Sequence, residues 1–283
     1  MGLEVVGIVG AGTMGNGIAQ VCAAAGLTVK LLDVSPAALD KALLTVSKNL
    51  DRQISKGTLD ADKKNVILGR IETTVDMENL SGVNIVIEAA TESLSLKNRI
   101  LNQIAHQVSA TCVIASNTSS FSITQLASNV THPERFIGLH FFNPVTVMLP
   151  VEVIKGLRTS DDTHSLVVEL ASRLDKTAIT VGNRPGFVVN RILIPMINEA
   201  VLVYQEGLAT AKDIDDGMML GCNHPLGPLA LADLIGLDTL LSILESLYEG
   251  FNDCKYRPAP VLKEMVAAGF LGRKTGRGFH AYD

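Results

Sequence analysis

The stretch that decides the fold is VVGIVGAGTMG, residues 5–15. A run rich in β-branched residues leads into Gly10, Gly12 and Gly15, which form a G-x-G-x-x-G pattern, and an alanine-rich segment continues to Gly26. A strand, a glycine turn and a buried helix in this order are typical of a dinucleotide-binding βαβ unit. A glycine-rich turn without a ligand is the alternative, and this context disfavours it.

A second predicted strand, LTVKLLD at residues 27–33, ends in Asp33, 18 positions after Gly15. A carboxylate at this position accepts hydrogen bonds from the adenosine ribose and repels a 2′-phosphate, so we predict NAD rather than NADP. Gly10 would make the tight turn, Gly12 would let the pyrophosphate approach the backbone, and Gly15 would let helix and strand pack closely. The helix N-terminus would offer N–H groups to the phosphates.

Composition and charge indicate a soluble globular protein. The 283 residues suffice for two domains, 47% of them are hydrophobic, and the formal net charge is −5. No block of like charges occurs, so we expect no nucleic-acid partner. Residues 5–29 carry no charge, but their six glycines and the lone preceding Glu4 favour a buried βα segment over a membrane span or signal peptide. We expect a cytoplasmic protein without a membrane segment.

The rest of the chain separates into a sheet-forming part and a helical part. Further buried strands are predicted at residues 83–89, 111–117 and 177–182. Helices are predicted at residues 94–107, 187–206, 212–220, 228–235, 238–248 and 261–268. We therefore predict a Rossmann-type doubly wound α/β domain over residues 1–184 and an all-α domain over residues 185–283.

Polar residues gather where two of the predicted strands end. Glu88 and Glu92 follow one strand, and SNTSS, residues 116–120, follows another. Because ligands of doubly wound sheets bind beyond the carboxyl ends of the strands, a cofactor or substrate is expected here. A capping turn before a helix near Ser122 is the alternative, but five polar residues exceed the needs of one cap.

A helix predicted between the Ser35-Pro36 cap and Gly57 has an apolar and a basic face. The basic residues on the face opposite the apolar stripe are Lys41, Lys48, Arg52 and Lys56. Spacing alone favours an ordinary solvated surface. The functional alternative is an electrostatic cradle for a phosphorylated substrate tail.

His140 ends the apolar run RFIGLH, and Glu152 lies within PVEVI, with a loop carrying Asn143 between them. If these two strands lie side by side, the side chains meet. A carboxylate buried among valines is costly without a partner, and an imidazole N–H is a natural one. The contact would fix the tautomer, stabilise the protonated ring and suit proton transfer to or from a substrate hydroxyl. A satisfied core histidine is the alternative.

Asn190 is a third polar residue in an apolar setting. It lies in line with Ile194, Ile197 and Val201, which predicts a position on the buried face of its helix. A buried amide needs hydrogen-bond partners. An interhelical hydrogen bond and a contact with a substrate oxygen are equally compatible with this spacing.

No metal site is predicted. The cysteines show no metal-binding spacing, which indicates reduced thiols: Cys22, Cys112, Cys222 and Cys254. The other histidines lie in polar or loop contexts, where no carboxylate partner is expected: His106, His132, His164, His224 and His280.

Taken together, these motifs resemble the short-chain 3-hydroxyacyl-CoA dehydrogenases over essentially the whole chain, and in particular their bacterial 3-hydroxybutyryl-CoA branch. The stretches that carry the resemblance are GIVGAGTMGNGIA, IEAATES, SNTSS, GLHFFNPV, VEVI, PGFVVNRI, NHPLGPLALADLIGLD and GRKTGRGF. No departure occurs in the catalytic segments.

The resemblance implies reversible hydride transfer between C3 of a 3-hydroxyacyl-CoA and NAD. His140 would be the acid/base, Glu152 its orienting carboxylate, and Ser119 and Asn190 would contact the reacting part of the substrate. Cofactor contacts would come from Gly10, Gly12, Thr13, Met14, Gly15, Asp33, Glu92, Lys97, Ser119, Asn143 and Lys274. Lys56 would lie near the CoA phosphates, with Asn49 in place of a serine that some relatives use.

A homodimer through the C-terminal domain is also implied by the resemblance. Two rival functions are a redox-inert NAD-binding protein on the same scaffold and a dehydrogenase of a small hydroxy acid without CoA. The first predicts a damaged His/Glu/Ser/Asn set, which is intact here. The second leaves the basic helix and the His/Glu pair without a purpose. Acyl-chain length depends on pocket depth and therefore on how the domains pack.

Overall fold

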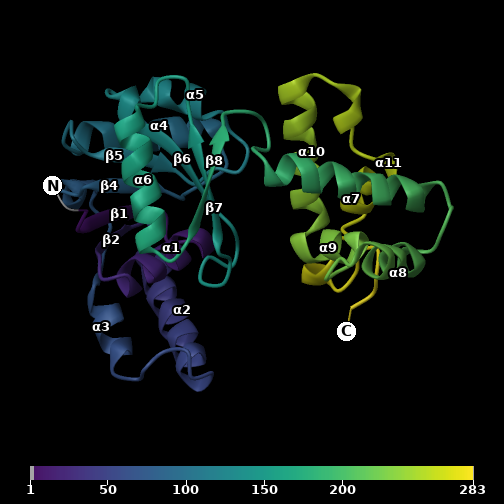
Figure 1. Cartoon of the computed structure of the whole chain (residues 1–283), viewed down its shortest axis with the longest axis horizontal. Helices are drawn as coiled ribbons and strands as arrows, with labels where there is room; N and C mark the ends of the chain where they lie inside the picture. The colour runs from purple at the N-terminus through teal and green to yellow at the C-terminus, as the bar shows by residue number, and fades with distance from the viewer. Residues whose placement is uncertain (1–2, 283) are drawn as a thin grey trace. The chain divides into compact units, whose positions relative to one another are not determined.

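The computed structural model describes residues 3–282. The chain divides into two compact units between Asn183 and Arg184. We call residues 3–183 the sheet unit and residues 184–282 the helical unit (Figure 1).

The sheet unit contains one eight-stranded sheet with the order β3-β2-β1-β4-β5-β6-β7-β8. Its strands are β1 (Val5–Val9), β2 (Thr28–Leu32), β3 (Ile71–Thr74), β4 (Ile85–Glu88), β5 (Val113–Ser116), β6 (Phe136–Phe141), β7 (Pro150–Lys155) and β8 (Thr177–Gly182). Neighbours pair in parallel except β6 and β7, which are antiparallel. The short β6–β7 connection explains this exception, because a parallel pair needs a long crossover.

The predicted strands are confirmed, whereas β3 has little sequence signal. Its residues IETT include a single buried side chain, Ile71, so no apolar run marks it. A strand of this kind forms because β2 offers an open edge with which it can pair.

Helices flank the sheet. They are α1 (Thr13–Ala24), α2 (Pro36–Ser55), α3 (Lys63–Gly69), α4 (Leu94–Gln107), α5 (Ile123–Leu126) and α6 (Asp161–Arg173). Ser35 caps α2 by accepting a hydrogen bond from the Ala38 N–H, and Ser122 caps α5 through the Gln125 N–H. These caps lie where the sequence places them.

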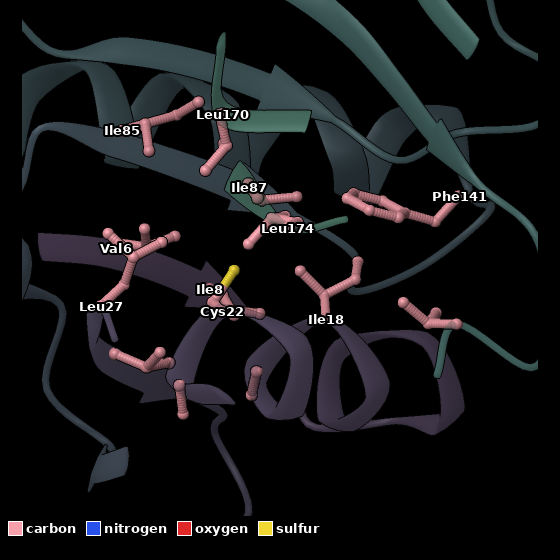
Figure 2. Close-up of a cluster of buried hydrophobic side chains, with 14 of the residues drawn as sticks. Val6, Ile8, Ile18, Cys22, Leu27, Ile85, Ile87, Phe141, Leu170 and Leu174 are labelled. Atoms are coloured by element: carbon pink, nitrogen blue, oxygen red, sulfur yellow. The ribbon is translucent and has the colours of Figure 1, made fainter. Parts of the chain in front are cut away.

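The main core of the sheet unit lies between the sheet and helices α1 and α6. Figure 2 shows Ile8 and Ile87 from the strands meeting Ile18 and Cys22 from α1 and Leu170 from α6. All five are buried, and each large aliphatic side chain contributes about 1.5–3 kcal/mol to stability. This packing makes the carboxyl ends of the strands a rigid platform.

The helical unit packs around its own core. Its helices are α7 (Val189–Gln205), α8 (Ala211–Cys222), α9 (Pro228–Ile235), α10 (Leu237–Phe251) and α11 (Pro260–Ala267). Leu229, Leu240, Leu244 and Leu262 are among the buried residues of this core. Most apolar residues from 226 to 247 therefore form core. Within residues 3–282, no helix is long and apolar enough to cross a membrane.

The first helix of this unit begins two residues later than the sequence predicts. Gly186 and Phe187 both have positive φ, +72° and +50°, which is incompatible with a right-handed helix. Helix α7 therefore starts at Val189 rather than at Phe187.

Candidate active site

Several site residues lie at the carboxyl ends of β1, β4, β5 and β6, which we call the carboxyl edge. Val9 pairs with Glu88, Glu88 pairs with Ser116, and Ser116 pairs with Gly138, two residues before His140. Polar residues that are well separated in the sequence, Glu88, Ser116 and His140, are thereby brought to one edge. In doubly wound sheets this edge is where ligands bind.

The glycine motif closes tightly between β1 and α1. Gly10 has φ +105°, which favours glycine. A Cβ atom on Gly15 would lie 1.7 Å from the Gly10 carbonyl oxygen, so helix and strand approach as closely as the motif predicts. A Cβ atom on Gly12 would meet nothing within 4 Å, which leaves room for a phosphate beside the first turn of α1.

Asp33 lies just after β2 and faces the same loop. Its carboxylate accepts hydrogen bonds from the N–H of Ala11 (2.8 Å) and of Ser35 (3.0 Å). It lines a cavity of about 400 Å³ together with Gly10, Val34 and residues of α4. The cavity therefore lies where the sequence predicts the adenosine ribose, beside the Asp33 carboxylate.

His140 and Glu152 form the contact that the sequence predicts. They are register partners on the antiparallel strands β6 and β7, and His140 Nδ1 lies 2.8 Å from Glu152 Oε2. Glu152 is 0% exposed and His140 7% exposed. The Phe142 ring packs against the imidazole at 4.8 Å between centroids. This hydrogen bond helps to compensate the burial of the Glu152 carboxylate.

The polar cluster after β5 is a connected network rather than a single helix cap. Glu92 accepts hydrogen bonds from the Thr118 hydroxyl (3.0 Å) and from the N–H (2.9 Å) and hydroxyl (3.2 Å) of Ser119. Asn117 accepts from the Phe141 N–H at 2.9 Å. The loop that carries Ser119 is therefore tied both to Glu92 and to the strand end that carries His140.

Lys97, predicted as a cofactor contact, is buried rather than exposed on the surface. Its side chain is buried in the first turn of α4, and its ammonium lies 2.6 Å from Glu88 Oε2.

Asn143 is exposed, and it lines a second cavity of about 410 Å³ together with Gly12, Thr13 and Asn16. The Asn143–Pro144 peptide bond is cis.

The basic helix α2 contributes to this second cavity in part. Lys41, Thr45 and Asn49 line it, and Asn49 Nδ2 donates to Gln20 Oε1 at 3.3 Å. Lys56 lies at the C-cap of the same helix and does not belong to the cavity lining. Thr45 is a lining residue that the sequence did not single out, because it lies on the basic face but carries no charge.

In the helical unit, Asn190 shares its face of α7 with Ile194, Ile197 and Val201, all of which are buried. Asn190 is half-buried in the first turn of α7. The buried amide of this helix is Asn198, which donates to the Arg257 carbonyl (3.1 Å) and accepts from the Ala259 N–H (2.9 Å). Lys274 pairs with both carboxylate oxygens of Asp238 at 2.6 Å.

The expectation that His140 alone has a carboxylate partner is wrong. His280 Nε2 lies 2.7 Å from Asp215 Oδ2, and exposed His132 lies 3.3 Å from Glu134. The first pair spans 65 positions of sequence, so no local pattern marks it. Within residues 3–282, no cluster of three or more His, Cys, Asp or Glu side chains is placed to hold a metal ion.

Family models match both units of the chain. Residues 5–184 match "3-hydroxyacyl-CoA dehydrogenase, NAD binding domain", and residues 186–282 match "3-hydroxyacyl-CoA dehydrogenase, C-terminal domain". The chain belongs to the 3-hydroxyacyl-CoA dehydrogenase family. The prediction of an NAD-type cofactor domain is confirmed by this match.

Individual relatives of the family align over nearly the full length. The chain is 48% identical to a probable 3-hydroxybutyryl-CoA dehydrogenase of Deinococcus radiodurans, over 98% of this chain and 99% of that one. It is 46% identical to its Bacillus subtilis counterpart, over 100% and 99%. The crystal structure of (S)-3-hydroxybutyryl-CoA dehydrogenase PaaH1 from Ralstonia eutropha is 58% identical, covers 100% of both chains and superposes with a TM-score of 0.98.

Proposed function

We propose that this chain is an NAD-dependent 3-hydroxyacyl-CoA dehydrogenase that interconverts (S)-3-hydroxybutyryl-CoA and acetoacetyl-CoA. Family membership supports the reaction class, and the names of relatives at 46–48% identity support the four-carbon substrate. The observation that carries the proposal is the buried hydrogen bond between His140 and Glu152, at the same sheet edge as the glycine motif.

His140 is the acid/base of the proposed reaction. An ionised Glu152 can only accept a hydrogen bond, so Nδ1 carries a proton and Nε2 is the nitrogen that receives the substrate's C3 hydroxyl proton. Glu152 orients the ring and stabilises the imidazolium that forms. In the reducing direction the ring returns the proton. When bound, NAD supplies the hydride acceptor and NADH the hydride donor.

The remaining residues bind and orient. The glycine motif with Thr13 and Met14 holds the pyrophosphate, and Asp33 holds the adenosine ribose. Ser119 and Asn190 contact the reacting part of the substrate. The proposed further cofactor contacts are Glu92, Lys97, Asn143 and Lys274. Substrate binding by α2 is proposed for Asn49, which lines a cavity, and for Lys56, whose ammonium attracts the CoA phosphates.

A spectrophotometric assay tests the proposal. NADH oxidation is followed with acetoacetyl-CoA and, in parallel, with free acetoacetate. Turnover of the CoA ester at a kcat/KM far above that of the free acid supports the proposal. Equal rates would favour a dehydrogenase of small keto acids, and no oxidation of NADH despite binding would favour a redox-inert NAD-binding protein. A ladder of 3-ketoacyl-CoA lengths then defines the chain-length range.

Cofactor preference has a separate test in Asp33→Ala. The substitution removes the ribose acceptor and the charge that repels a 2′-phosphate, so kcat/KM with NADH should fall more than with NADPH. A loss of roughly tenfold or more in the NADH/NADPH ratio is expected for a charged hydrogen bond. An unchanged ratio would assign cofactor choice to other residues.

We further propose a cytoplasmic homodimer formed through the helical unit. Exposed apolar side chains on this unit support the dimer: Ile192, Leu208, Leu220 and Leu234. Light scattering at micromolar concentration tests it, and a monomer would contradict it. Cell fractionation tests the location.

A further inference from the structure

A buried ion pair lies beneath the carboxyl edge. Glu88, the last residue of β4, is 0% exposed, and Lys97 of α4 is 1% exposed. Glu88 Oε2 receives the Lys97 ammonium (2.6 Å) and the Ser116 hydroxyl (2.7 Å), and Oε1 receives the Ala90 N–H (2.9 Å). A buried pair of charges is stabilising only if further hydrogen bonds satisfy it. Here three donors converge on one carboxylate.

The Ala90 hydrogen bond shapes the wall of the glycine loop. It closes the turn that follows β4, and this turn packs directly on Gly10. A Cβ atom on Gly10 would lie 2.6 Å from Ala90 Cα and 2.7 Å from the Ala89 carbonyl oxygen. Ala90 also lines the cavity that contains Asp33. A displacement of this turn therefore changes the space in which the cofactor binds.

The Ser116 hydrogen bond acts on the other side of the edge. Ser116 is the last residue of β5 and begins the loop that carries Ser119. The next residue, Asn117, accepts from the Phe141 N–H, beside His140. The residue after Asn117 is Thr118, whose hydroxyl donates a hydrogen bond to Glu92. The hydrogen bond of Ser116 to Glu88 therefore fixes the start of the loop, before the hydrogen bonds made by Asn117 and Thr118.

We propose that Glu88 is a positioning residue of the dehydrogenase reaction. Its carboxylate, charge-balanced by Lys97, fixes the turn at Ala90 and the start of the Ser119 loop relative to each other. Glu88 acts through these groups and touches neither substrate nor cofactor. The effect on turnover rests on the proposed function, whereas the effect on NADH binding does not.

Three variants separate positioning from plain stability. Glu88→Gln keeps the side-chain shape but leaves the Lys97 ammonium buried without a counter-charge, so both thermal stability and NADH affinity should fall. Glu88→Gln with Lys97→Met removes both charges and should recover most of the melting temperature. Ser116→Ala leaves the ion pair in place and removes one anchor. Asp51→Asn is the matched control, because it breaks the more exposed Lys64–Asp51 pair of the same unit.

The readouts are melting temperature, NADH affinity by fluorescence titration, and kcat with acetoacetyl-CoA. Ser116→Ala should weaken NADH binding or lower kcat about tenfold, the worth of one hydrogen bond to a charged group. The charge-free double variant should stay at least tenfold impaired at near wild-type melting temperature. The Asp51→Asn control should match the wild type in NADH affinity and kcat.

Two outcomes would overturn the proposal. One is a double variant that regains wild-type NADH affinity and kcat together with its stability, which would reduce the pair to a structural role. The other is a Ser116→Ala variant with wild-type binding and turnover, which would leave Lys97 as a direct cofactor contact and nothing more. If the wild type fails to reduce acetoacetyl-CoA, the proposed function fails, and NADH titration alone still decides the role of Glu88.

Discussion

Each unit of the chain holds a histidine hydrogen-bonded to a buried carboxylate, at nearly the same distance. In the sheet unit, His140 Nδ1 lies 2.8 Å from Glu152, and in the helical unit, His280 Nε2 lies 2.7 Å from Asp215. Distance alone therefore does not distinguish a site from a structural contact. The surroundings of the two carboxylates do.

The Asp215 carboxylate accepts hydrogen bonds from backbone N–H groups. Its oxygens accept the N–H groups of Leu229 (2.7 Å) and Ala230 (2.9 Å), which belong to the first turn of α9. Neighbouring Asp233 likewise accepts from the N–H groups of Phe279 and His280. Together these carboxylates hold the C-terminal segment onto α9. The His280 pair belongs to this set of contacts, which ties the C-terminal segment to α9.

Glu152 lies instead in the middle of a strand, opposite His140, at the carboxyl edge that also presents the glycine motif and the Ser119 loop. Under the proposed function, the comparison teaches that an imidazole–carboxylate pair serves proton transfer when its histidine lies near the end of a strand at a ligand-binding edge. The same pair serves stability when its carboxylate caps a helix.

The largest expected effect comes from the sheet-unit pair. His140→Ala and Glu152→Gln should each lower kcat roughly 10²- to 10⁴-fold, the usual worth of general acid–base catalysis. NADH affinity, measured by fluorescence titration, should remain close to that of the wild type. Near-normal turnover of His140→Ala would end its assignment as the acid/base.

The helical-unit pair should respond in the opposite way. Asp215→Ala removes the acceptor for two helix N–H groups and for His280, so the free energy of unfolding should fall by about 2–3 kcal/mol. In protein that remains folded at the assay temperature, kcat should change little. Urea unfolding and the acetoacetyl-CoA assay measure the two quantities. A loss of kcat as large as that of His140→Ala would erase the distinction between the pairs.

Thiol reactivity should separate the two units as well. Burial raises the pKa of Cys22 and of Cys112 to about 12, whereas Cys222 and Cys254 are exposed. At pH 8 the sheet-unit thiols carry almost no thiolate and should resist a thiol reagent until the protein unfolds. Peptide mapping by mass spectrometry identifies the labelled sites. Labelling of Cys22 or Cys112 in the native protein would contradict this picture.

The same two thiols predict a pH dependence. Their folded pKa lies above the ordinary value of 9.0, so the folded state holds more protons than the unfolded state between pH 9 and about 12. The stability that they contribute is complete below pH 9 and is lost as the pH rises through that window. The unfolding free energy of the wild type should therefore fall more steeply above pH 9 than that of Cys22→Ala, so that the advantage of the wild type at neutral pH shrinks.

The smallest effect is expected from the exposed pair Asp238–Lys274. Partial burial raises the pKa of Asp238, but hydrogen bonds from Lys274 and from the Thr239 N–H outweigh it, and the net pKa lies below 3.8. The stabilisation is thus present above pH 3.8 and is lost as the pH falls further. Asp238→Asn should cost at most about 1 kcal/mol at pH 7 and less near pH 3, by urea unfolding. If Asp238→Asn lowered the free energy of unfolding more than Asp215→Ala, the expected order of the two variants would be wrong.

The sequence by itself determined the features that local patterns encode. The glycine motif, the caps at Ser35 and Ser122, and the helix at residues 94–107 follow from spacing within a few turns of chain. The approach of His140 to Glu152 was also predictable, because a short connection between two apolar runs favours an antiparallel pair whose register sets the contact.

Only the tertiary structure decided which polar groups are buried and with whom. Lys97 is an ordinary helix lysine in sequence, yet it is 1% exposed against Glu88. Asn198 rather than Asn190 is the buried amide of α7, and His280 finds Asp215 across 65 residues. Burial and long-range hydrogen bonds depend on how whole elements pack against one another. A periodic pattern describes one element at a time and therefore cannot contain that information.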